Sequence, residues 1–190
     1  ASGLLTPTVG GPSVFPPQPE GVYAFTQTQK EWSTSVGDDR FRRTMYTFFY
    51  RSAPHPFLSA FDVPDFQTTC TRRVRSNTPL QALTMTNDPA LLEIAAGLAD
   101  RLLREGPGQL AGRLRHGFLL TVCREPTPAE LEVLDEHYRQ QLAAYATSPE
   151  EAQALLPAEL IQHGEPAAAT VALLQTARLL LNTDNFITRE

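Results

Sequence analysis

Hydrophobic residues in the second half of the chain recur at the spacing of a helix face. Apolar side chains follow one another every four residues within 109–123, which predicts a helix there with its stripe toward a core. A similar apolar pattern after Pro166 predicts a last helix that reaches about Asn182. The stripe within 109–123 consists of Leu110, Leu114, Phe118 and Val122.

Polar residues followed by proline mark where other helices begin. Thr78-Pro79 and Asp88-Pro89 each place an N-cap side chain before a proline at the first helical position. They predict helices over about 79–86 and 89–105, and Gly106-Pro107-Gly108 ends the second of them.

Two capping boxes predict further helices. In Thr127-Pro128-Ala129-Glu130, the glutamate side chain can return to the threonine amide, and Ser148-Pro149-Glu150-Glu151 has the same form. The helices are expected near 128–146 and 149–156. The fold class is therefore mainly α, with a helical bundle over about residues 79–182 and short connections.

The first 78 residues predict an irregular arm and loops wrapped on that bundle. Residues 1–20 contain five prolines, which remove backbone donors, and hydrophobic side chains that keep the arm against the body of the protein. Residues 40–50 are aromatic and favour a short helix, because Arg43, Tyr46 and Tyr50 fall at helical spacing. Residues 51–69 predict an ordered loop that packs Phe57, Phe61 and Phe66.

Length and composition fit a single domain over residues 1–190. Within it, we expect an irregular arm and loops over residues 1–78 and the helical bundle over residues 79–190. The chain has 190 residues, is 42% hydrophobic and 19% charged, and opens at Ala1 without an initiator methionine, so we expect the C-terminal part of a longer protein. It has no apolar run near the roughly 20 residues that cross a bilayer, so it is not expected to be transmembrane.

The distribution of charge argues against nucleic acid as a partner. The net charge is -5, and residues 91–190 carry eight basic and fourteen acidic side chains. Phosphate backbones are bound by positive fields, which an acidic chain does not supply.

The two cysteines, Cys70 and Cys123, lie far apart and form no C-x-x-C pair. No zinc site, redox pair or C-x-x-C-H haem attachment is predicted, so the chain itself is expected to hold no cofactor or metal. A disulfide between Cys70 and Cys123 is one alternative, and two separate buried thiols are the favoured one.

Three residues are weak candidates for catalysis. His55 lies in the rigid loop Ala53-Pro54-His55-Pro56, where an imidazole could act as a base or ligand, but no second metal-binding residue stands at ligand spacing. Asp62 and Asp65 could serve acid–base chemistry or a calcium ion. We favour turn-capping and pairing with nearby arginines for these carboxylates.

Seven arginines within 36 residues form the most informative local feature. Guanidinium groups can bond backbone carbonyls that a proline-rich segment leaves without a ladder, and this structural role is the favoured interpretation. The functional alternative is a site for an anion, an acidic sugar or an acidic partner. The candidate binding residues are Arg42, Arg43, Arg51, Arg72, Arg73 and Arg75.

Several blocks in succession resemble the PSD1 domain, the domain of unknown function 1553 of planctomycetes and related bacteria. They include Gly10-Gly11-Pro12-Ser13-Val14, Arg42-Arg43-Thr44-Met45-Tyr46, Phe61-Asp62-Val63-Pro64-Asp65, the run Cys70–Leu83 and the closing run Leu181–Glu190. The order of these blocks is similar over nearly the whole chain.

The resemblance implies an exported protein in the periplasm or cell envelope, with this domain following a companion domain and often a c-type cytochrome module. It implies no catalytic residue. We therefore expect a non-catalytic structural or interaction domain of a cytochrome-associated protein, with a c-type cytochrome or membrane electron-transfer complex as partner and any haem carried there. The alternative is a hydrolytic or carbohydrate-active domain that binds an anionic ligand through the arginines.

Overall fold

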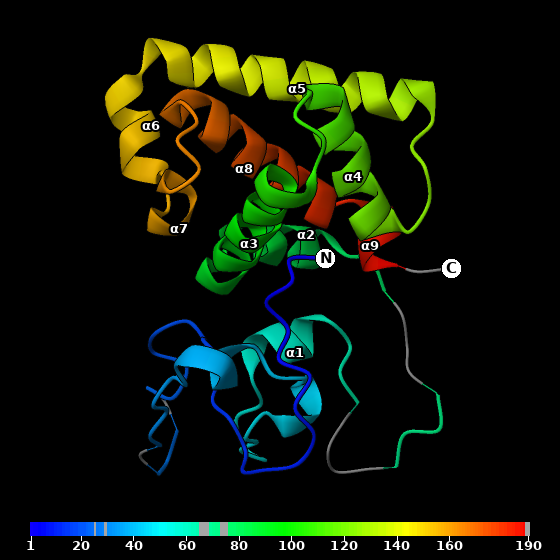
Figure 1. The fold of residues 1–190 in the computed structure, drawn as a ribbon. Coiled ribbons are helices and arrows are strands. Elements are labelled where there is room, and N and C mark those ends of the chain that lie inside the picture. Colours follow the sequence, from blue (N-terminus) through cyan, green and yellow to red (C-terminus); the bar gives the residue numbers. More distant parts are fainter. Residues whose placement is uncertain (25, 29, 65–68, 73–75, 189–190) are drawn as a thin grey trace. The chain divides into compact units, whose positions relative to one another are not determined.

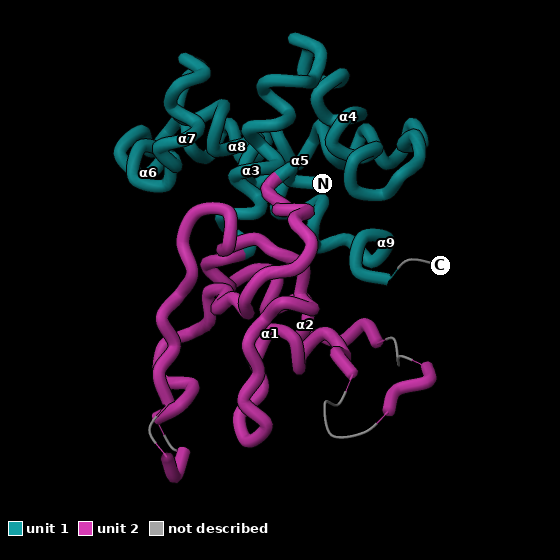
Figure 2. Tube along the Cα trace, turned by 60° about the horizontal axis from the view of Figure 1, so that its bottom comes forward, with its two compact units in different colours: residues 1–3, 91–190 teal, residues 4–90 magenta. Residues whose placement is uncertain are grey.

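The computed structural model divides the chain into two compact units. One, here the N-terminal unit, is residues 4–90, and the other, the bundle unit, is residues 1–3 and 91–190 (Figure 2). The structure describes residues 1–24, 26–28, 30–64, 69–72 and 76–188. Within these residues there are helices and isolated β-bridges and no strand, which confirms the mainly α fold class.

The bundle unit is built around one central helix, α8 (Ala167–Leu181), which packs against four others (Figure 1). Nine of its 15 residues are buried, from Thr170 to Leu181, so it is apolar nearly all round, as expected of a core helix. The helices that surround it are α4 (Leu110–Val122), α5 (Pro128–Thr147), α6 (Pro149–Leu155) and α9 (Asp184–Ile187). The unit also contains most of α3 (Pro89–Glu105) and the short α7 (Ala158–Ile161).

Close packing of α4 depends on a glycine. A Cβ atom added at Gly117 would lie 3.0 Å from Leu180 and 3.2 Å from Leu102, so a side chain there would press on α8 and α3. Next to it, Leu114 and Phe118 of α4 meet Leu134 and Leu180 in one buried cluster. Two residues of the predicted stripe, Leu114 and Phe118, are therefore core residues, and Leu110 and Val122 pack at its edge.

The helices predicted in the second half are confirmed to within two residues at each end. The short α7 and α9 were not predicted, because each has only four residues and too few positions to show a period. Thr127 makes the predicted capping box, with its side chain accepting from the Glu130 amide and the Glu130 carboxylate accepting from the Thr127 amide. The hydrogen bond from Arg124, and then that from Thr127, lowers the pKa of Glu130 to about 2.

The capping box predicted at Ser148 is wrong. Ser148 makes no side-chain cap hydrogen bond, and its own amide donates to the Tyr145 carbonyl at 3.3 Å. The reason is that α5 runs to Thr147 and α6 starts at Pro149, so one residue ends one helix and begins the next. Its backbone (φ -131, ψ 69) lies outside the extended region that a serine N-cap needs.

The N-terminal unit has little regular structure. It contains α1 (Pro56–Ala60), α2 (Pro79–Asn87) and two 3-10 turns, η1 (Gly37–Phe41) and η2 (Thr44–Tyr46). The helix expected within 40–50 is thus a 3-10 turn, and the loop expected over 51–69 contains α1, which begins with a proline. Because α2 belongs to this unit, the boundary between the units falls at residue 90 instead of 78.

The arm lies along residues 41–48 without forming a sheet. Val14, only 3% exposed, is its anchor: its amide donates to the Tyr46 carbonyl and its carbonyl accepts from the Phe48 amide, both at 2.8 Å. Thr6 makes a similar contact with the Phe41 carbonyl at 3.0 Å. Prolines between these points remove the donors that would join them into a ladder.

Among the described residues, no helix is both long and apolar enough to cross a membrane.

The N-cap positions of α5 and α6, each followed by a proline, allow a matched test. Thr127→Ala removes a capping hydrogen bond and should lower the free energy of unfolding of the bundle unit by about 1 kcal/mol. Ser148→Ala removes none and should change it by less than about 0.5 kcal/mol. Urea unfolding followed by far-ultraviolet circular dichroism measures both, and equal losses would contradict the difference between the two caps.

Candidate functional site

Arg42 holds the arm through its guanidinium group. Its Nη1 donates to the Pro12 carbonyl at 3.1 Å, and its Nη2 donates to the carbonyls of Thr8, at 3.2 Å, and Gly10. The guanidinium also lies 3.9 Å from the ring centre of Tyr46, whose hydroxyl accepts from the Gly10 amide at 2.9 Å. Arg42 thus satisfies backbone carbonyls in the proline-rich arm, the structural role favoured from the sequence.

The turn that Arg42 encloses requires glycine. Gly10 and Gly11 have φ of 83 and 90, a region that side chains with a Cβ rarely adopt. A Cβ atom added at Gly11 would lie 3.5 Å from Nη1 of Arg42, so a larger side chain there would meet the guanidinium group. The arm can therefore fold closely over the arginine.

The other candidate arginines are placed differently. Arg43, Arg51 and Arg72 are exposed, whereas Arg73 and Arg75 lie outside the described residues. Anion or partner binding by these side chains stays a prediction. Arg42 is engaged with the arm, so among the described candidates the exposed guanidinium groups are those of Arg43, Arg51 and Arg72.

His55 is buried, with 5% of its surface exposed. Its Nε2 lies 3.0 Å from the Pro17 carbonyl, and because a carbonyl only accepts, Nε2 carries the proton of the neutral ring. Nδ1 is then an acceptor, and it is buried and has no hydrogen-bond partner among the described residues. Burial lowers the pKa of His55, although the contact with the Pro17 carbonyl opposes this effect.

His55 is one wall of an aromatic cluster. Its ring centre lies 5.6 Å from that of Trp32, and Trp32 meets the edge of Phe15 at 5.1 Å. The other contacts join Phe15 to Phe48, Phe48 to Tyr50 and Tyr50 to Tyr23 at 5.0–5.3 Å. We call Phe15, Tyr23, Trp32, Phe48, Tyr50 and His55 the aromatic cluster, in which His55 is buried and the other five residues are half-buried.

The Asp62 carboxylate is also engaged in structural hydrogen bonds. Its carboxylate accepts from the amide of Ser76 at 2.9 Å and from its hydroxyl at 2.6 Å. The Ser76 hydroxyl in turn accepts from Gln81, a side chain only 1% exposed that also donates to the Ala60 carbonyl at 2.9 Å. These bonds join the end of α1 to the start of α2. The second carboxylate, Asp65, lies outside the described residues.

Gln81 is the residue of this network that the sequence analysis missed. The signal was present, since Thr78 and Gln81 have the spacing of a capping box, and the structure shows that box complete. Asp62 has a φ of 54, a left-handed conformation that aspartate tolerates better than most residues.

Both cysteines are free and exposed in the structure and belong to different units, and the Cys70–Cys123 disulfide stays a prediction. The expectation of buried thiols is wrong, because both residues are exposed. Cys123 takes the left-handed position (φ 62) that ends α4, which turns its side chain out of the apolar stripe. Cys70 belongs to the other unit.

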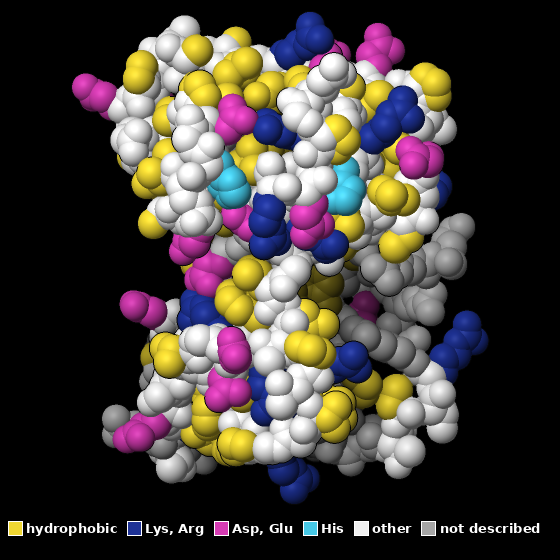
Figure 3. Space-filling view, viewed as in Figure 1, with side chains coloured by type: hydrophobic (Ala, Val, Ile, Leu, Met, Phe, Trp, Pro, Cys, Tyr) yellow, Lys and Arg dark blue, Asp and Glu magenta, His cyan; other side chains and the backbone are white. Residues whose placement is uncertain are grey.

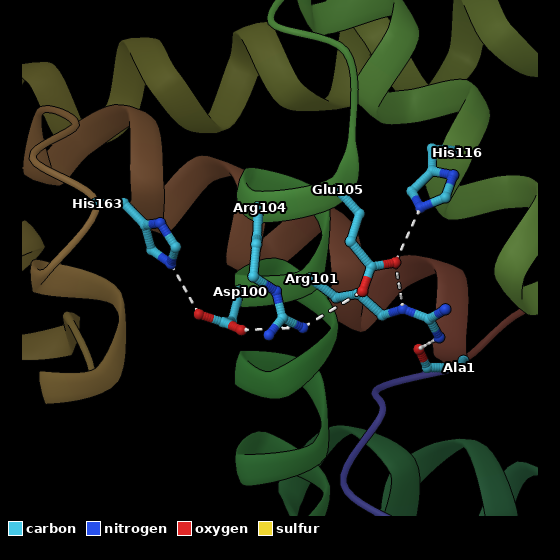
Figure 4. A network of polar contacts seen from close by, with 7 residues as sticks. All are labelled: Ala1, Asp100, Arg101, Arg104, Glu105, His116 and His163. Atoms are coloured by element: carbon cyan, nitrogen blue, oxygen red, sulfur yellow. Dashed lines mark hydrogen bonds and ion pairs between the residues drawn. The ribbon is translucent and has the colours of Figure 1, made fainter.

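A polar network on α3 gathers two histidines, His116 and His163 (Figure 4). His163 Nε2 lies 2.7 Å from the Asp100 carboxylate, and His116 Nε2 lies 3.6 Å from the Glu105 carboxylate. Figure 3 shows histidine side chains, in cyan, among basic and acidic ones on this face of the bundle unit. The hydrogen bond from Arg101 is the main cause that lowers the pKa of Glu105.

This network joins segments of the bundle unit. Arg101 donates to the Ala1 carbonyl at 2.9 Å and to Glu105 at 2.7 Å, so residue 1, α3, α4 and the segment after α7 meet in one set of contacts. A carboxylate can orient an imidazole for base catalysis, but that chemistry also requires a nucleophile or substrate beside the ring. The described residues contain no group of three or more histidines, cysteines and carboxylates placed to hold a metal ion.

Comparison with known proteins finds one family. The model of PSD1, described as "Protein of unknown function (DUF1553)", matches residues 1–138. No curated protein and no solved structure matches the chain.

The Arg42 contacts predict a specific loss of stability. Arg42→Lys keeps the charge but removes the forked donors, so the free energy of unfolding of the N-terminal unit should fall by about 1–3 kcal/mol. The exposed neighbour provides the control, because Arg43→Lys should cost less than about 0.5 kcal/mol. Trp32, the single tryptophan, reports on this unit by fluorescence in urea. Equal losses would show that the arm is held by other contacts.

The buried imidazole predicts a dependence of stability on pH. Because the folded pKa of His55 lies below 6.5, the unfolded chain binds more protons between the two pKa values. The contribution of His55 is therefore complete above 6.5 and is lost as the pH falls through the folded pKa.

His55→Gln keeps a donor for Pro17 and cannot titrate, so its stability should fall less than that of the parent protein between about pH 7 and about pH 5. Trp32 fluorescence in urea gives both slopes. His163→Gln, in the other unit, should leave the Trp32-reported slope unchanged, and parallel slopes for His55→Gln and the parent would refute the role of His55.

Proposed function

From the premise that this chain belongs to the PSD1 (DUF1553) family, we propose that it is a non-catalytic structural and interaction domain of an exported, cytochrome-associated protein. Its place would be on the outer side of a membrane, as an accessory part of a respiratory or photosynthetic electron-transfer complex. Haem would be carried by the partner or by a companion domain.

The observation that carries the proposal is the state of His55. A general base must reach a proton on its substrate within hydrogen-bond distance. The His55 ring packs beside Trp32, its protonated nitrogen is directed at the Pro17 carbonyl, and 5% of its surface is exposed. This favours a structural role for the strongest catalytic candidate of the sequence.

The other candidates support the same view. The Asp62 carboxylate accepts from Ser76, and the Arg42 guanidinium holds the arm. An enzyme that binds an anionic ligand through the arginines, the alternative function, would need these groups for the ligand. In the structure, the Asp62 carboxylate and the Arg42 guanidinium both make their contacts within the N-terminal unit.

Exposed arginines provide a surface for a partner. Arg43, Arg51 and Arg72 are exposed on the N-terminal unit, and guanidinium groups at a polar rim steer acidic partners and fix their register. Such contacts act mainly on the association rate and are weakened by salt.

The proposal predicts that a c-type haem protein accompanies the native protein. We expect the tagged protein, isolated from detergent-extracted envelopes of its own host, to carry a partner with the reduced-minus-oxidised spectrum of c-type haem. Arg43→Glu and Arg51→Glu should each reduce the recovered haem several-fold, whereas Arg139→Glu, an exposed arginine on α5, should not. A protein recovered from the cytoplasmic fraction without haem would contradict both the location and the partner.

A further inference from the structure

A groove of about 710 Å³ opens beside the aromatic cluster. The described residues that line it come from the single stretch 18–34, which belongs to the N-terminal unit. Tyr23 and Trp32 supply its aromatic surface, with ring centres 6.0 Å apart and planes tilted by 49°. None of the candidate catalytic residues or arginines that the structure describes lines it, so we treat it as a separate site.

The two aromatic rings are held in place from the interior. The Trp32 indole donates to the Pro16 carbonyl at 2.8 Å and meets Phe15 nearly at a right angle (83°). Tyr23 meets the edge of Tyr50 at 5.3 Å. Because these contacts fix the rings before any ligand arrives, binding in the groove would cost little ordering of side chains.

The polar groups of the groove balance in charge. Glu20 and Lys30 contribute one charge of each sign, and Gln18, Thr26 and Thr34 add neutral amide and hydroxyl groups. Lys30 lies 5.2 Å from the ring centre of Tyr50, which keeps its ammonium group near the aromatic surface. The described lining residues carry no net charge, so the groove favours a ligand that forms hydrogen bonds and is itself uncharged.

We propose that this groove binds a neutral carbohydrate. A sugar ring presents an apolar face of C–H groups, which packs on aromatic rings, and hydroxyl groups at its edge, which bond to carboxylate, ammonium, amide and hydroxyl groups. Fixed aromatic rings with a few convergent polar side chains are the usual composition of a small-ligand site. Tyr23 and Trp32 would pack on the sugar face, and Glu20 and Lys30 would bond its hydroxyl groups.

A proline-rich peptide is the other ligand that aromatic grooves commonly bind. Recognition of such a peptide relies on side-chain donors that reach its carbonyl groups, because its backbone makes no internal hydrogen bonds. The indole N–H of Trp32 already donates to Pro16, and the Glu20 carboxylate of the lining can only accept. A proline backbone has no N–H to donate to Glu20, whereas a sugar hydroxyl can donate to it, so the lining favours the carbohydrate.

The single tryptophan makes the test direct, since Trp32 lines the groove and no other indole contributes to the emission. Titration of the protein with cellohexaose, xylohexaose or mannohexaose should give a saturable change in fluorescence for at least one of them. Calorimetry with the same sugar gives the affinity independently.

Two pairs of variants locate the ligand. Tyr23→Leu and Glu20→Gln should each weaken binding about tenfold. Their matched controls, Phe57→Leu in α1 and Glu31→Gln beside Trp32, do not line the groove and should bind as the parent protein does. Circular dichroism shows whether each variant is folded, and Glu20→Gln remains informative if Tyr23→Leu is not.

Three results would overturn the proposal. One is the absence of a response to all three hexasaccharides at about 10 mM, a concentration that detects even weak binding. Another is a saturable response to a proline decapeptide and none to the sugars, which would assign the groove to peptides. The third is equal weakening by Glu20→Gln and Glu31→Gln, which would place the ligand elsewhere.

Discussion

Hydrogen bonds from side chains to backbone carbonyls hold the N-terminal unit together. Its prolines remove the amide donors that a ladder would use, and carbonyls far along the chain find side-chain donors instead. Arg42 bonds the arm, Trp32 bonds Pro16, His55 bonds Pro17 and Gln81 bonds Ala60. Each of these donors could also bond a ligand. Because the unit uses them to bond its own carbonyl groups, they are not available to bind a ligand or to catalyse a reaction.

This constraint explains where prediction from sequence succeeded. Helices of the second half begin and end on local signals within a few residues, such as the Thr127–Glu130 capping box, and their ranges were predicted closely. In the N-terminal unit the decisive partners lie 30 residues apart for Arg42 and Pro12 and 38 for His55 and Pro17. Residue composition suggested that arginines would bond carbonyls, but no local pattern identified Arg42 or its acceptors.

The candidate site shows the same limit. His55 was a candidate because two prolines make its loop rigid. Rigidity alone does not distinguish an exposed imidazole that could bind a metal or substrate from a buried one that donates a structural hydrogen bond. Its burial results from rings that span residues 15 to 55 of the chain, and such non-local packing leaves no period in the sequence. The groove escaped notice for the same reason, since Tyr23 and Trp32 become neighbours only when Tyr50 and Phe15 support them.

The aromatic cluster links stability to binding in the N-terminal unit. Phe15, Tyr50 and the Pro16 carbonyl, which position Trp32 for the groove, also belong to the packing that holds the unit together. A ligand that packs on Trp32 would bind the folded unit and not the unfolded chain, so it would stabilise the unit by mass action. Protonation of His55, which contacts the same indole, would act in the opposite direction. Ligand and proton would then influence one structure through a shared ring, because the Trp32 side chain belongs both to the core and to the surface.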